Sequence, residues 1–289
     1  MLNRQKTLLY LLQSADRPLL KTEVTKWSFL LRNEFESAGG SAFYDFVPYR
    51  FGPFSFCLYQ EAGKLENQGL ITTVGTGKSQ KWKLKENIEF KLPEKQTRVD
   101  IETVVKQFRK RKLPDLIDYV YERYPKYTYN SEIKKLAKPP KAKKGIYTAG
   151  YEGISVDTFL NMLVQKGIKR LIDVRNNPIA RRYGFHKSTL DRLTGNLGIE
   201  YVHFPQLGIV SDKRQDLDEQ KQRDRLFKEY ARTTLKRETD AISLVGKLVK
   251  EKPSVLVCME AEPCCCHRSH LAEKVSGLIE FPVIHIYPH

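Results

Sequence analysis

The second half of the chain alternates between short apolar runs and segments whose apolar residues recur at helical spacing. GIYTAGY, KRLIDVR, IEYVHFP, PSVLVCME and PVIHIYP are short apolar runs, which predict strands. SVDTFLNMLVQKG and RSHLAEKVSG predict helices between strands, and a longer helical stretch is expected over 218–250. Alternation of this kind predicts an α/β domain with a mostly parallel sheet and helices on both faces, which we place at residues 145–289.

The first 136 residues show a different order of elements. NRQKTLLYLLQSA and LKTEVTKWSFLLRNEF have apolar residues at helical spacing, and a third helix is expected to begin at Pro53 and to stop at Gly69. LITTVGTGKSQKWKLK then predicts two strands joined by a glycine-containing turn. Three helices followed by a two-stranded wing are typical of a winged-helix α+β domain, which we place at residues 1–136.

A lysine- and proline-rich segment separates the two halves. KKLAKPPKAKKG contains six lysines and the pair Pro139–Pro140. Proline interrupts helices and like charges repel one another, so residues 137–144 are expected to form an exposed linker.

The overall composition fits two packed domains. The chain has 289 residues, of which 40% are hydrophobic, and no apolar run approaches the ~20 residues of a membrane span. The apolar stretch near the N-terminus is too short for a signal peptide, so a cytoplasmic location without membrane contact is expected. Cysteines in that compartment are thiols or metal ligands and not a disulfide framework.

The net charge of +16 favours a polyanionic partner, with DNA preferred, although a soluble charged surface gives the same number. Nucleic-acid contacts are expected from Lys78, Lys81 and Lys83 on the wing and from Arg109 and Arg111 in the basic run VVKQFRKRK. The third helix carries glutamates as well as lysine, so protein docking by this domain is an open alternative.

Polar residues follow the predicted strands of the second half. Tyr151 follows the first strand, Asp173 and Arg175 the second, and Cys258 and Glu260 the fourth. The carboxyl ends of parallel strands share one edge of a sheet, so these side chains are expected to converge there. A structural ion pair between Asp173 and Arg175 is nearly as good an interpretation as a catalytic role.

The stretch CMEAEPCCCHRSH, residues 258–270, holds four of the five cysteines. Soft metal ligands are available from Cys258, Cys264, Cys266, His267 and His270. Their spacing is not that of paired zinc motifs and all would come from one loop, so we predict no metal and no other cofactor.

The same stretch also suits anion or thiol chemistry. A helix beginning near Cys266 would direct unpaired N–H groups at a phosphate or a thiolate, and Arg268 adds a fixed cation. We therefore expect Cys258, Glu260, His267 and Arg268 to face one pocket, and no role for Cys264 and Cys265.

Two family resemblances accompany these patterns. YRFGPFS before a helix and the later YVYERYPKYT resemble Panacea-type antitoxin domains and their winged-helix relatives. The G-Y after the first strand, D-V-R with the following proline and arginine, the L-G turn, C-x-E and C-H-R resemble the domain-of-unknown-function family DUF488 over residues 145–287.

The second resemblance implies a compact α/β domain in which a defined set of residues matches the family pattern: Asp173, Arg175, Cys258, Glu260, Cys266, His267 and Arg268. Cys264 and Cys265 are not part of that pattern. Members often carry His where Tyr151 stands, so a role for that His does not carry over.

Together these patterns predict a nucleic-acid-associated protein that processes nucleic acid or a nucleotide, as in defence or repair. The catalytic candidates are Glu260, Cys258, Asp173, Cys266 and His267. The ligand-binding candidates are Tyr151, Arg175, Arg181, Arg182 and Arg268. The alternative is a non-enzymatic DNA-binding regulator whose α/β domain senses a ligand, a metal or the redox state.

Overall fold

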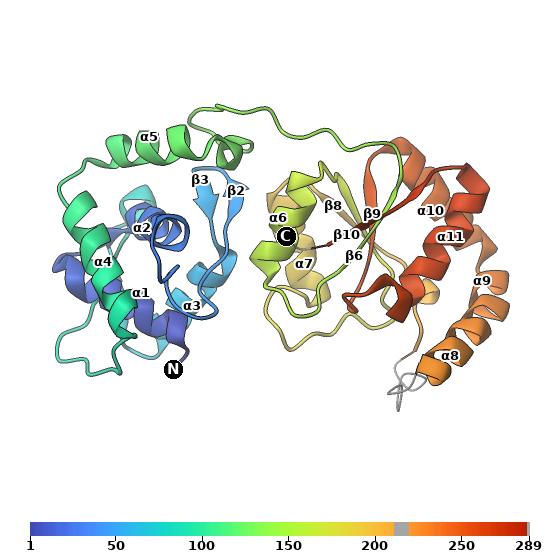
Figure 1. The fold of residues 1–289 in the computed structure, drawn as a ribbon, viewed down its shortest axis with the longest axis horizontal. Coiled ribbons are helices and arrows are strands. Elements are labelled where there is room, and N and C mark those ends of the chain that lie inside the picture. The colour runs from blue at the N-terminus through green and yellow to red at the C-terminus, as the bar shows by residue number, and fades with distance from the viewer. Residues whose placement is uncertain (211–219, 288–289) are drawn as a thin grey trace. The chain divides into compact units, whose positions relative to one another are not determined.

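The computed structural model of the protein describes residues 1–210 and 220–287, which fall into two compact units, Met1–Pro139 and Pro140–His289. Each unit has its own sheet and its own helices, and Figure 1 labels those elements for which there is room. Among the described residues, no helix is both long and apolar enough to cross a membrane.

The N-terminal unit is a mixed α+β structure. Its helices and strands are α1 (Asn3–Ala15), β1 (Leu19–Leu20), α2 (Lys21–Glu34), β2 (Val47–Tyr49), β3 (Gly52–Phe54), α3 (Phe56–Asn67), β4 (Ile71–Val74), β5 (Lys81–Leu84), α4 (Lys95–Phe108) and α5 (Leu113–Arg123). The antiparallel sheet has the order β1–β5–β4, and β2 and β3 form a separate hairpin. The apolar faces of α1 and α2 enter one core, in which Trp27 is fully buried and Phe29 makes edge contacts with Tyr124 and Tyr127.

The third helix begins three residues later than the sequence pattern suggests. Pro53 lies in β3 opposite Pro48, and Gly52, which directly follows the turn at Arg50 and Phe51, has a φ of 84°. Ser55 caps the helix instead, because its hydroxyl accepts a hydrogen bond from Leu58 N at 3.2 Å. The expectation that Pro53 begins the helix was therefore wrong.

The C-terminal unit is built on a five-stranded, wholly parallel sheet. Its elements are β6 (Ile146–Gly150), α6 (Val156–Gln165), β7 (Arg170–Asp173), α7 (Lys187–Asn196), β8 (Glu200–His203), α8 (Gln220–Arg232), α9 (Thr234–Arg237), α10 (Thr239–Glu251), β9 (Ser254–Cys258), α11 (His267–Ile279) and β10 (Val283–Ile286). The strand order is β10–β6–β9–β7–β8.

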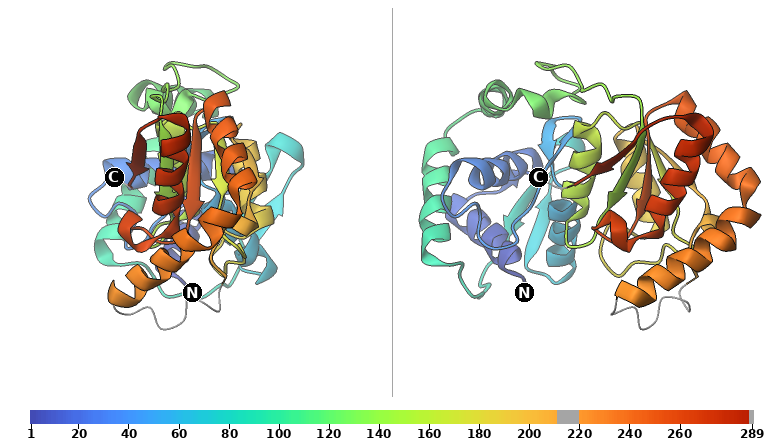
Figure 2. Two further views of the ribbon diagram at one scale, coloured as in Figure 1. Left: turned by 90° about the vertical axis from the view of Figure 1, so that its right-hand side faces the viewer. Right: turned by 45° about the vertical axis from the view of Figure 1, so that its right-hand side comes forward.

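Helices cover both faces of this sheet. Figure 1 shows α6 and α7 on one face and α10 and α11 on the other, and Figure 2 shows α8 beside α11. The three central strands β6, β7 and β9 are buried along their whole length, as expected of strands with helices on both sides. The structure confirms the predicted α/β class, with a smaller α+β region at the N-terminal end.

The helical stretch expected over 218–250 is divided into α8, α9 and α10. Residues 218 and 219 lie outside the described part of the chain. Glu238 has φ −89° and ψ 40°, away from helical values, so the hydrogen-bond ladder stops there. The short α9 buries Leu235 against the core between the two longer helices.

Candidate functional site

The loops that follow β6 and β9 are hydrogen-bonded to each other at the carboxyl edge of the sheet. Met259 O accepts hydrogen bonds from Tyr151 N at 3.0 Å and Glu152 N at 2.9 Å. Gly150 permits this approach, because a Cβ atom there would lie 1.8 Å from the carbonyl oxygen of Glu260. The contact fixes the segment that carries Glu260.

Two thiols, an imidazole and a carboxylate meet at this edge. Cys258 is the last residue of β9, Cys266 is the N-cap of α11, and His267 is the first residue of that helix. The Sγ of Cys258 lies 3.0 Å from Glu260 Oε2 and 3.8 Å from His267 Nδ1, and Cys266 Sγ lies 4.0 Å from the same nitrogen. Cys258, Cys266 and His267 are buried, whereas Glu260 is half-buried.

The orientation of His267 is set by its other ring nitrogen. Nε2 lies 3.1 Å from the carbonyl oxygen of Val174, which can only accept a hydrogen bond, so Nε2 carries a proton. In the neutral ring, Nδ1 then presents its lone pair toward the two sulfur atoms. The Tyr230 ring packs edge-on against the imidazole at a centroid distance of 5.4 Å and further restricts it.

The surroundings disfavour a free thiolate at Cys266. Burial raises the pKa of this thiol well above its usual value, and the neighbouring Cys258 and Glu260 raise it further. Neutral thiols, or thiolates with a bound cation, are the states that suit this position.

A cleft of about 380 Å³ opens onto the cluster. Its lining consists of Glu152, Ile209, Arg223, Leu226, Phe227, Met259, Glu260, Glu262, Cys265 and His267. Three of these side chains are glutamates and one is an arginine, so the lining is acidic although the chain as a whole is basic. The remaining wall is largely apolar.

Arg268, expected to hold an anion, is instead directed at the backbone. Its Nη1 and Nη2 donate to the carbonyl oxygens of Glu260 and Ala261, and the residue is 1% exposed. In this arrangement Arg268 positions the Glu260 segment and does not line the cleft.

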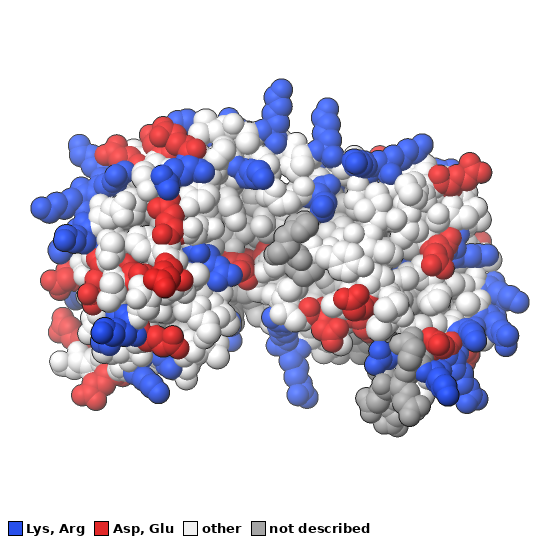
Figure 3. All heavy atoms as spheres, in the orientation of Figure 1, with Lys and Arg blue, Asp and Glu red and all other residues white. Residues whose placement is uncertain are grey.

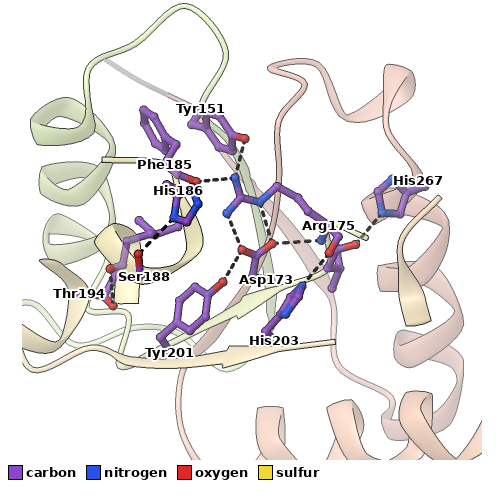
Figure 4. A network of polar contacts seen from close by, with 12 residues as sticks. Tyr151, Asp173, Arg175, Phe185, His186, Ser188, Thr194, Tyr201, His203 and His267 are labelled. Carbon is purple, nitrogen blue, oxygen red and sulfur yellow. Dashed lines mark hydrogen bonds and ion pairs between the residues drawn. The ribbon is translucent and has the colours of Figure 1, made fainter. Parts of the chain in front are cut away.

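Asp173 and Arg175 form a buried ion pair beside the cluster (Figure 4). Asp173 accepts from Arg175 Nε at 2.8 Å, from Arg175 Nη2 at 2.5 Å and from the Tyr201 hydroxyl at 2.6 Å. Arg175 Nη1 donates to Tyr151 Oη at 2.7 Å and to Phe185 O at 2.8 Å. Burial raises the pKa of Tyr201, and the Asp173 carboxylate raises it further.

This network has the character of a structural support. Asp173 is fully buried and Arg175 is 5% exposed, and all three guanidinium nitrogens donate to protein oxygens. Figure 4 also shows His203 donating to Arg175 O, at 2.8 Å, close to the Val174 carbonyl that orients His267. Asp173 and Arg175 therefore hold the segment on which the histidine is oriented.

The remaining candidates of this unit are more dispersed. Arg181 and Arg182 are exposed in the segment after Pro178 and do not line the cleft. Cys265, expected to have no role, lines the cleft with its Sγ 3.3 Å from Arg223 Nη1. Sequence reasoning missed Arg223 and Tyr230, because nothing in the spacing of α8 shows that its apolar face turns toward the strand ends.

The N-terminal candidates Lys78, Lys81, Lys83, Arg109 and Arg111 are all exposed. Lys81 and Lys83 flank the buried Trp82 on β5, so both point away from the core. Arg111 lies over the rings of Phe108 and Tyr119, at 5.3 and 4.9 Å from their centroids.

A second cleft, of about 310 Å³, lies in the N-terminal unit next to Lys78. Its lining includes four basic residues and four aromatic residues, but no acidic one among the described residues: Lys21, Lys26, Arg50, Lys78, Tyr49, Phe51, Phe54 and Tyr59. Burial lowers the pKa of Lys26 to about 7, and its Nζ donates to the carbonyl oxygens of Phe51 and Pro53. Only Lys78 of this set was identified from the sequence.

Comparison with known proteins bears on the C-terminal unit. No curated protein and no solved structure matches the chain significantly. The resemblance of the N-terminal half to winged-helix and Panacea-type domains stays a prediction. Residues 155–275 match the model of a family described as "Domain of unknown function DUF488", and this stretch includes the Asp173–Arg175 pair and the whole thiol–histidine–carboxylate cluster. The C-terminal unit therefore carries a domain of the DUF488 family.

Proposed function

We propose that the protein is a nucleic-acid-associated enzyme that acts on a nucleobase, with its reactive centre at Cys258, Glu260, Cys266 and His267. The observation that carries this proposal is the meeting of these four side chains beneath a cleft at the carboxyl edge of a parallel sheet. The thiols, the imidazole and the carboxylate can accept or donate a proton and lie in contact with one another there. General acid–base catalysis requires such an arrangement.

The lining of the cleft favours a base over a phosphate. Three glutamates against one arginine repel a phosphate, while carboxylate oxygens accept hydrogen bonds from the exocyclic amino groups of bases. The side chains of Ile209, Leu226 and Phe227 provide apolar surface for a flat ring. Enzymes that act on a base take it out of the stack into a pocket of this kind.

The N-terminal unit supplies the contact with the nucleic-acid strand in this proposal. The sheet order β1–β5–β4 with α1, α2 and α3 is compatible with a winged helix, and Lys78, Lys81 and Lys83 are exposed on or next to its wing. The cleft around Lys26 combines aromatic rings with cations, which suits a stacked base and its phosphate. Figure 3 shows basic and acidic side chains mixed on the face in view, so contacts with phosphate are expected to be local.

The test is a change in the mass of defined oligonucleotides. Single-stranded and duplex DNA and RNA containing all four bases are incubated with the wild-type protein, with Glu260→Gln and with Glu273→Gln, and the products are analysed by mass spectrometry. Glu273 is an exposed residue of α11 outside the cleft, which makes it a matched control. Conversion by the wild type and by Glu273→Gln, but not by Glu260→Gln, supports the proposal.

A DNA-binding regulator is the second candidate, because a buried pair of thiols beside a histidine also suits a redox or metal sensor. Oligonucleotides that bind but keep their mass, with affinity that changes on thiol oxidation, would favour the regulator and count against the enzyme.

A further inference from the structure

The residues of the cluster come from two separate structural elements. Cys258 closes β9, whereas Cys266 and His267 begin α11 on the other side of the intervening loop. We predicted no metal from the sequence because the spacing of these residues is not that of paired zinc motifs and because all of them would come from one loop. A strand end and a helix start are both rigid, so the second of these reasons does not hold in the structure.

The spacing of the three atoms is that of a metal site. Cys258 Sγ, Cys266 Sγ and His267 Nδ1 all lie within 4.8 Å of one another, and the two sulfur–nitrogen distances are 3.8 and 4.0 Å. Zinc–sulfur bonds of about 2.3 Å and zinc–nitrogen bonds of about 2.0 Å place tetrahedral ligand atoms about 3.5–3.8 Å apart. The two sulfur–nitrogen distances need a contraction of a few tenths of an ångström to reach these values, and the two sulfurs, which lie within 4.8 Å of each other, need to come to about 3.8 Å.

The neighbours of these three atoms provide a second, independent indication of a metal site. Histidines that bind metals donate their other N–H to a carbonyl or carboxylate, and His267 Nε2 is directed at Val174 O at 3.1 Å. The ring nitrogen that faces the sulfurs is therefore the one with a lone pair.

We propose that Cys258, Cys266 and His267 bind one zinc ion and leave a fourth position open toward Glu260 and the cleft. Two thiolates and one imidazole are the donor set of a three-ligand catalytic zinc site, in which water fills the last position. Glu260 stands beside the group, with Oε2 3.0 Å from Cys258 Sγ, where it can take a proton from that water. Its role as proton acceptor rests on the proposed function, whereas the zinc site itself does not.

The experiment measures the metal directly. The full chain is purified under reducing conditions without chelator and analysed for zinc, and the apoprotein is then titrated with Co²⁺ and followed by absorption. We expect about one zinc per chain and, with cobalt, sulfur-to-metal charge-transfer bands together with the intense visible bands of tetrahedral coordination.

The variants Cys258→Ser, Cys266→Ser and His267→Gln should lose the metal. Cys264→Ser should keep it, because Cys264 is exposed and belongs to no ligand group among the described residues. Circular dichroism shows whether each variant folds. If the ligand variants do not fold, the cobalt spectrum of the wild type decides.

Three results would overturn the zinc site. These are wild-type protein that binds neither zinc nor cobalt, a folded Cys266→Ser variant that keeps its full metal content, and a cobalt spectrum without sulfur ligation. A Cys258–Cys266 disulfide in the protein as purified, with no metal uptake after reduction, has the same consequence. Zinc bound as described without conversion of any base would leave the site standing and refute the proposed enzyme.

Discussion

Replacing Asp173 by Asn separates a structural from a catalytic role for the Asp173–Arg175 pair. The side chains have the same shape, but the amide carries no charge to balance Arg175, which is 5% exposed. Removing one partner of a buried ion pair costs about 3–5 kcal/mol, because the remaining charge is left unbalanced away from water. The variant should therefore be destabilised by this amount.

This loss in the free energy of unfolding should lower the midpoint of urea denaturation. With a slope of about 2 kcal/mol per molar urea, the midpoint for the C-terminal unit should fall by about 1.5–2.5 M. Both tryptophans, Trp27 and Trp82, are in the N-terminal unit, so fluorescence follows that unit, and circular dichroism reports the remaining transition. Arg237→Gln is the control, because this arginine is 73% exposed in its ion pair and its loss should cost at most about 1 kcal/mol.

A contrary outcome is easily recognised. If Asp173→Asn unfolds within about 1 kcal/mol of the wild type, and activity or binding is nevertheless lost, the pair is not a structural support. The reasoning from burial and hydrogen bonding would then be refuted, and Asp173 would return to the catalytic candidates.

Three further predictions concern other parts of the molecule. Burial lowers the pKa of Lys26 from 10.5 to about 7, so between these pH values the unfolded state binds more protons than the folded state. The free energy of unfolding should therefore rise from pH 7 to about pH 10.5. Urea titrations should show this rise in the wild type but not in Lys26→Met. Gly150→Ala should shift the Glu260 segment and weaken base binding, measured by calorimetry, whereas Gly195→Ala, with no atom within 4 Å of its added Cβ, should not. DNA affinity should fall linearly with salt on logarithmic axes, and Lys78→Ala should reduce the slope by about 1; fluorescence anisotropy that shows neither effect would remove Lys78 as a phosphate contact.

The sequence contained the architecture of the C-terminal unit but not the order of its strands. Alternating apolar runs and amphipathic segments specify a parallel sheet covered by helices. Periodicity does not say that β9 inserts between β6 and β7, because the order of strands depends on contacts between segments that are distant in the chain. This insertion brings Cys258 next to the segment after β7 and lets His267 reach Val174 O.

The candidate site was only partly visible in the sequence for a similar reason. The resemblance and the strand-end argument both pointed to Cys258 and Glu260, and the resemblance also included His267. Neither could tell whether Arg268 binds backbone carbonyl groups or an anionic ligand, because this depends on whether its side chain is buried. The acidic lining of the cleft arises from three separate loop positions and has no signature in the net charge.

The basic and aromatic cleft of the N-terminal unit could not be predicted from the sequence either. Lys26 reads as an ordinary surface residue of an amphipathic helix, yet it is 1% exposed. Its burial results from the β2–β3 hairpin folding over α2, with Gly52 allowing the turn that brings two carbonyl groups to Nζ. Such a contact between distant segments cannot be inferred from local spacing.

A crystal structure of Glu260→Gln grown with a short single-stranded oligonucleotide tests directly whether the C-terminal cleft binds a nucleobase. We expect one base in this cleft, with its ring against Phe227 and Leu226 and its reacting edge at His267 and residue 260. A base bound elsewhere, or a phosphate group in that cleft, would refute the proposed base-binding site.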